Sequence, residues 1–136
     1  MSESTVSSLS FADSLDLKNS RSLCNCCLTI LESLKTHDLI SIDVSAHSSL
    51  TDYMLIGTGT SSRHVVAIAD KLSEKLRELG ATGLTLSGQE SGEWVIVDCG
   101  GVIVHLMQSA VRERYQLDEL YRCLASGQFS ELADAS

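Results

Sequence analysis

The chain has few basic residues and no long apolar run. Its 136 residues include 10 Lys and Arg against 18 Asp and Glu, which gives a formal net charge of −8 at pH 7. Binding to a nucleic-acid backbone needs clustered Lys and Arg, so the charge argues against direct nucleic-acid binding and favours a basic protein as partner. The same charge would also serve solubility alone. A membrane-spanning helix needs roughly 18 apolar residues in a row, so we expect no membrane segment.

The sequence also lacks a secretory signal and a regular cysteine framework. Its five cysteines are odd in number and irregularly spaced, which indicates reduced thiols in a reducing compartment. The first twenty residues are rich in Ser and contain Glu3, Asp13 and Asp16 against a single Lys18. A mitochondrial presequence is instead rich in Arg and poor in acids. We therefore expect a cytoplasmic protein.

The length fits one domain with a single core. Residues 1–19 show no sustained period and are expected to form a disordered or weakly ordered extension. Residues 20–124 are expected to form the folded domain, and residues 125–136 a C-terminal tail.

Hydrophobic periodicity predicts helices interspersed with strands. The predicted segments, in chain order, are a helix over 19–37, strands over 39–44 and 53–60, a helix from Ser61 or Ser62 to Leu79, a strand over 84–87, a hairpin over 94–107 and a helix over 109–124. This order predicts an α/β fold in which a mixed β-sheet is covered by helices, with the hairpin making part of the sheet antiparallel.

The hairpin WVIVDCGGVIVHLM is expected to turn at Gly100 and Gly101. That register pairs Asp98 with Ile103 and Ile96 with His105, and alternation then makes one face wholly apolar. The opposite, mixed face carries Trp94, Ile96, Asp98, Ile103, His105 and Met107.

The mixed face has two interpretations. A buried carboxylate is costly without a partner, so this face is either partly solvated or covered by a helix. Together with Glu90 and Glu93, its aromatic and apolar residues have the composition of a protein-binding hot spot. Alternatively, Trp94 packs under the last helix while Asp98 and His105, about 7–8 Å apart as diagonal neighbours, satisfy each other. No Ser or Cys nucleophile accompanies this pair, so it does not predict a catalytic site.

Three other segments are candidates for chemistry. The loop GTGTSSRH, residues 57–64, could cradle a phosphate, but it lacks a P-loop Lys, and a capped strand-to-helix turn is the simpler interpretation. Cys24, Cys26 and Cys27 contain a C-x-x-C spacing without a second pair of ligands, which favours core packing over a metal site. On the last helix, Arg112, Arg114 and Tyr115 either bind an acidic group or pair with Asp118 and Glu119.

Three stretches in combination, SSLTDYMLIGTGTSSRHV, WVIVDCGGVIVHLM and RERYQLDELY, resemble the ribosomal silencing factor family, also called Iojap. The resemblance covers residues 23–121. It implies a nucleotidyltransferase-like α/β fold without the catalytic carboxylates, no enzymatic activity and no cofactor or metal. It further implies a translation repressor that binds the large ribosomal subunit through its protein fourteen and sterically blocks joining of the small subunit.

The hairpin face and the resemblance together give the expected partner-binding residues: Trp94, Ile96, Asp98, His105, Met107, Glu90, Glu93, Asp52, Tyr53, Arg112 and Tyr115. Gly101 and Ser87 depart from the family pattern, since acids are common at both positions. The alternative function is a nucleotide-binding enzyme of nucleotidyltransferase type that uses the Gly57–Ser62 loop. The sequence does not decide between a monomer and a homodimer.

Overall fold

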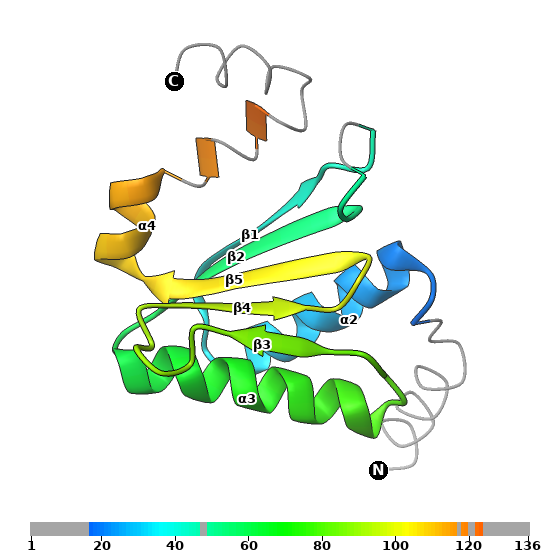
Figure 1. The fold of residues 1–136 in the computed structure, drawn as a ribbon, viewed down its shortest axis with the longest axis horizontal. Coiled ribbons are helices and arrows are strands. Elements are labelled where there is room, and N and C mark those ends of the chain that lie inside the picture. The colour runs from blue at the N-terminus through cyan, green and yellow to red at the C-terminus, as the bar shows by residue number, and fades with distance from the viewer. Residues whose placement is uncertain (1–16, 47–48, 117, 120–121, 124–136) are drawn as a thin grey trace.

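A computed structural model gives the fold and describes residues 17–46, 49–116, 118–119 and 122–123 (Figure 1). The elements, in chain order, are α2 Ser20–Ser33, β1 His37–Asp43, β2 Tyr53–Gly59, α3 Ser62–Glu78, β3 Thr85–Ser87, β4 Trp94–Asp98, β5 Val102–Gln108 and α4 Ser109–Tyr115. This is the predicted order of helices and strands, so the α/β fold is confirmed. The predicted extension and tail lie outside the described residues, except for residues 17–19.

The strands form one mixed five-stranded sheet in the order β1-β2-β5-β4-β3. Strands β2 and β5 run parallel at its centre, and the other neighbours are antiparallel. Both central strands are buried along nearly their whole length, which explains why their sequences are almost continuously apolar. The hairpin pairs Asp98 with Ile103 and Ile96 with His105, so its predicted register is confirmed.

Helices α2 and α3 cover one face of this sheet (Figure 1). Each begins at a side-chain cap: Asn19 Oδ1 accepts from the Ser22 N–H at 3.1 Å, and Ser61 Oγ accepts from the His64 N–H at 3.1 Å. Their apolar stripes pack with the apolar face of the hairpin into the main core. Cys24, Cys26 and Cys27 are buried in this core, so the packing interpretation of these residues is confirmed.

Short helix α4 lies over the other face of the sheet (Figure 1). A second apolar cluster fills the space there and consists of Ile42, Val44, Met54, Ile56, Ile103, Met107 and Val111. The mixed face of the hairpin is therefore covered in part by a helix.

The last helix is shorter than predicted. Instead of continuing to residue 124, α4 ends at Tyr115, and Gln116 adopts a left-handed conformation with φ 48° and ψ 47°. Residues 118–119 and 122–123 are helical again, and residues 117, 120–121 and 124 lie outside the described part. The left-handed residue redirects the chain and lets the Asp118 carboxylate meet Arg112 of α4. The helical spacing of apolar residues continues through this break, so the sequence pattern does not predict it.

Gly101 explains how closely α2 approaches the hairpin turn. A Cβ at this position would collide with Ser20 Oγ at the start of α2. That hydroxyl donates a hydrogen bond to the Asp52 carboxylate. The departure from the family pattern at Gly101 therefore leaves room for a contact between helix, loop and turn.

Among the described helices, none has the length and hydrophobicity to cross a membrane.

Candidate functional site

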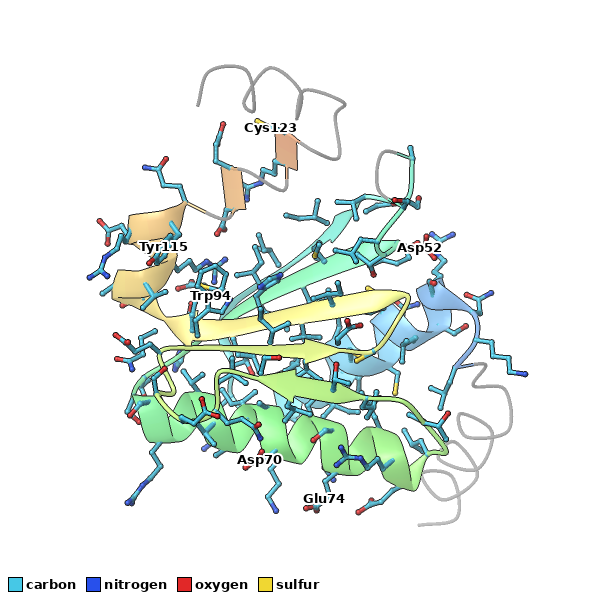
Figure 2. All side chains as sticks on the ribbon, viewed as in Figure 1. Asp52, Asp70, Glu74, Trp94, Tyr115 and Cys123 are labelled. Atoms are coloured by element: carbon cyan, nitrogen blue, oxygen red, sulfur yellow. The ribbon has the colours of Figure 1, made fainter. Side chains whose placement is uncertain are left out.

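Three rings form a cluster where β4 begins and α4 crosses the sheet. The indole Nε1 of Trp94 donates a hydrogen bond to His105 Nδ1 at 3.1 Å, and their ring centroids lie 5.9 Å apart. The Tyr115 ring also packs against Trp94, with centroids 5.2 Å apart. Figure 2 shows Trp94 and Tyr115 together beside α4. We call Trp94, His105 and Tyr115 the aromatic cluster.

Local sequence explains this arrangement. Trp94 pairs with Met107, and His105 pairs with Ile96, so Trp94 and His105 are diagonal neighbours on one face of the hairpin. Helix α4 follows β5 without a linker, and the chain therefore turns back over that face at once. The seventh residue of α4, Tyr115, then lies above Trp94.

Exposure within the cluster increases from His105 to Tyr115. The His105 side chain is 4% exposed, Trp94 is half-buried, and Tyr115 is 53% exposed. A large aromatic residue with half of its surface in solvent, supported from beneath by a second ring, is typical of an interface anchor. The cluster thus presents Tyr115 and one part of Trp94 to the outside.

Burial sets the charge of His105. Loss of solvation lowers the pKa of this imidazole from 6.5 to about 4, so it is neutral at neutral pH. A neutral imidazole that accepts at Nδ1 carries its proton on Nε2. This protonation state is the one that the Trp94 hydrogen bond requires.

Asp98 lies at the other end of β4. Its Oδ1 accepts a hydrogen bond from the Gly100 N–H at 2.9 Å, which closes the hairpin turn where Gly100 has φ 88°. The ring nitrogen Nδ1 of His105 instead bonds to Trp94. His105 Nδ1 and Asp98 Oδ1 therefore accept from different groups, the Trp94 indole and the Gly100 N–H.

Arg112 links α4 to three other segments. Its Nη1 donates to the Asp38 carbonyl at 2.6 Å and to Thr58 Oγ1 at 2.9 Å. Its Nε and Nη2 donate to the two carboxylate oxygens of Asp118 at 3.0 and 2.8 Å. The hydrogen bond from Arg112 lowers the pKa of the Asp118 carboxyl. The predicted alternative, pairing of Arg112 with Asp118, is thus what the structure contains.

Asp38 and Thr58 are partners that the sequence did not indicate. Asp38 lies at an irregularity of the β1–β2 pairing between His37 and Ile40 and has φ 48°. It binds Arg112 through its backbone carbonyl, a group that every residue possesses. Asp38 could have been identified as a partner only from its positive φ at a bulge, and no signal in the sequence predicts that φ. Both residues line a hollow of about 680 Å³ beside α4 that also includes Glu113, Gln116 and Arg122.

The remaining predicted site residues divide between the two ends of the sheet. Glu90 and Glu93 are exposed in the loop before Trp94 and so lie near the aromatic cluster along the chain. Ile96 is half-buried, and Met107 is fully buried beneath the cluster. A direct contact of Met107 or His105 with a partner would require the covering side chains to move.

Asp52 and Tyr53 occupy the end of the sheet opposite the aromatic cluster. Figure 2 shows Asp52 near the start of α2, far from Trp94 and Tyr115. Its carboxylate accepts from Ser20 Oγ, and Tyr53 packs against the core under α2 and α3. The structure therefore does not bring these two residues together with the cluster.

Three N–H groups in and beside the loop considered for phosphate binding, those of Thr60, His64 and Val65, have acceptors within the chain. The Thr60 N–H donates to His64 Nδ1 at 2.9 Å, the His64 N–H to Ser61 Oγ, and the Val65 N–H to the Ser61 carbonyl at 2.9 Å. A phosphate would have to displace these bonds. Within the described segments, no group of three or more His, Cys, Asp and Glu side chains is placed to hold a metal ion.

The thiols of α2 have environments that oppose ionisation. Burial raises the pKa values of Cys24 and Cys26. The Cys99 thiol and burial together raise the pKa of Cys27. Reactive and metal-binding cysteines need the thiolate form, which these surroundings disfavour.

Comparison with known proteins places the chain in a family. The model for "Ribosomal silencing factor during starvation" matches residues 17–135. A ribosomal silencing factor of Chromobacterium violaceum is 44% identical over 91 residues, which cover 67% of this chain and 75% of that protein. A mouse protein named for mitochondrial assembly of the ribosomal large subunit is 31% identical over 97 residues, covering 69% of this chain and 42% of its own length.

A solved structure agrees with these relatives. A crystal structure of a Chromobacterium violaceum protein has a TM-score of 0.72 at 38% sequence identity and covers 76% of this chain and 86% of that one. Since the family model matches residues 17–135 and so covers every described residue, the chain belongs to the family of ribosomal silencing factors.

Proposed function

We propose that this protein is a cytoplasmic translation repressor, not an enzyme. It binds the large ribosomal subunit through that subunit's protein fourteen and sterically blocks the joining of the small subunit. Family membership supports the ribosomal role, and the name of the mouse relative links that protein to the large subunit. The identification of protein fourteen as the partner rests on the resemblance of the sequence to the family. The mechanism needs only a bound surface in the right place, and no chemical step.

The aromatic cluster is the observation that supports this proposal most. Tyr115 is 53% exposed and rests on Trp94, which His105 holds by a hydrogen bond. Rigid aromatic side chains bury a large area at small entropic cost, and they dominate the binding energy of many interfaces. Exposed Glu90 and Glu93 in the loop before Trp94 would orient a basic partner.

The other predicted residues have supporting roles in this proposal. His105 and Met107 form the floor of the cluster, Ile96 extends its apolar edge, and Arg112 holds α4. Asp98, Asp52 and Tyr53 lie toward the far end of the strands. Their participation in binding would require a partner that spans the length of the sheet.

Co-sedimentation with purified large subunits tests the proposal. Replacing either ring, as Tyr115→Ala or Trp94→Ala, should weaken binding by about 2 kcal/mol, which is roughly thirtyfold in Kd. Glu74→Ala is the control, since this exposed residue lies on the outer side of α3 (Figure 2). If both ring variants fold and bind like the Glu74 variant, the aromatic cluster is not the binding surface.

The alternative, a nucleotide-binding enzyme that uses the Gly57–Ser62 loop, makes a different prediction. Calorimetry with a nucleoside triphosphate and Mg²⁺ would then show saturable binding that is lost in Gly59→Ala. We expect no such heat, because the loop lacks a P-loop Lys and the N–H groups of Thr60 and His64 already have acceptors within the chain.

A further inference from the structure

We propose that Arg112 is a positioning residue: it fixes α4 to the sheet and thereby holds Tyr115 against Trp94 in the geometry that binds the partner. This inference rests on the proposed function, because it identifies the group that shapes the proposed binding surface. Arg112 itself is only 12% exposed and therefore offers little surface to a partner.

Helix α4 needs such a fixing group. It has seven residues, Ser109–Tyr115, and only Val111 among them is buried. An isolated helix of this length is unstable in water, since short helices form too few hydrogen bonds to offset nucleation. Its N-cap residue, Gln108, makes no side-chain capping hydrogen bond, and its C-cap residue, Gln116, is in the left-handed conformation. Tertiary contacts must therefore determine where α4 lies.

The hydrogen bonds of Arg112 supply those contacts on both sides of α4. Nη1 reaches two strands at once, through the Asp38 carbonyl on β1 and Thr58 Oγ1 on β2. Nε and Nη2 form a bidentate pair with Asp118, which lies beyond the break at Gln116. A planar guanidinium can make these bonds simultaneously, and a Lys ammonium cannot reproduce the fork.

The bulge in β1 is part of the same arrangement. Asp38 has φ 48° at the point where the β1–β2 register shifts. Bulges at sheet edges commonly redirect a backbone or side-chain group. Here the redirected group is the carbonyl at 2.6 Å from Arg112 Nη1. The edge strand β1, helix α4 and the segment after Gln116 are thus joined by the side chain of Arg112, which lies three residues before Tyr115.

The position of Tyr115 in the free protein can be followed through Trp94, because the chain has one Trp. Arg112→Gln removes both the charge and the forked guanidinium, whereas Arg112→Lys keeps the charge and removes only the forked group. Arg114→Gln is the matched control, because it removes a positive charge from the same helix at an exposed position. We expect acrylamide to quench Trp94 several-fold more strongly in both Arg112 variants and not in Arg114→Gln. Circular dichroism establishes that each variant is folded, and if Arg112→Gln does not fold, Arg112→Lys provides the test.

Co-sedimentation with large subunits supplies the second readout. Arg112→Gln should weaken binding about tenfold, and in the Tyr115→Ala background it should add little, because the ring that it positions is already absent. Unchanged quenching in folded Arg112 variants would overturn the inference, and so would an equal loss of binding in both backgrounds. If the wild-type protein does not bind large subunits, the proposed function fails, and the quenching result still decides the role of Arg112.

Discussion

At the scale of single residues, the indole of Trp94 has a fixed orientation because its N–H is bound to His105. The partner would then meet ring surface rather than an indole hydrogen-bond donor. Tyr115 covers part of that surface and is itself 53% exposed. Affinity in this account comes mainly from aromatic burial, and charge contributes orientation.

His105 should make stability depend on pH in a defined window. Its folded pKa, about 4, lies below its ordinary value of 6.5, so the unfolded chain binds the proton more readily. The contribution of His105 to the free energy of unfolding is therefore fully present above pH 6.5. It decreases as the pH is lowered from 6.5 to about 4, and the free energy levels off below about 4. The total loss of unfolding free energy is on the order of 3 kcal/mol.

Urea unfolding at a series of pH values measures this effect, with His105→Asn as the comparison. The variant should lose most of the dependence between pH 6.5 and 4. Asp43 and Asp118, whose pKa values lie below the ordinary 3.8, titrate outside this window. An equally steep dependence in the variant would exclude His105 as the source.

At the scale of secondary-structure elements, α2 and the β4–β5 turn are packed without space for a side chain at Gly101. Gly101→Ala should force Ser20 away and break its hydrogen bond to Asp52, which costs about 1–3 kcal/mol of unfolding free energy. Denaturant unfolding measures this loss. In a Ser20→Ala background the additional cost of Gly101→Ala should be smaller, and equal costs in the two backgrounds would contradict this explanation.

The sequence was sufficient to predict the regular helices and strands, but not the contacts between them. Alternation fixed the hairpin register and placed Trp94 and His105 on one face, as the structure confirms. The break at Gln116 was missed because the helical period of apolar residues continues through it, and a backbone in the left-handed region has no signature in a Gln. The Asp38 carbonyl was missed because backbone acceptors do not depend on residue type.

At the scale of the whole molecule, the net charge of −8 predicts how binding depends on salt. Attraction between an acidic protein and a basic partner is screened over about 10 Å at 0.1 M salt. Binding to large subunits should therefore weaken as ionic strength rises, as measured by co-sedimentation or pull-down at two salt concentrations. Replacing both exposed loop acids, as Glu90→Gln with Glu93→Gln, should reduce this dependence. Affinity that does not change with salt would argue against acidic steering.

Subunit joining is the step that the proposed mechanism controls. Purified small and large subunits can be mixed with a molar excess of the protein, and formation of complete ribosomes can be followed by light scattering. We expect the protein to suppress joining, and Tyr115→Ala to restore joining in proportion to its loss of affinity. Complete ribosomes that form equally fast and to the same extent with saturating protein present would contradict the account.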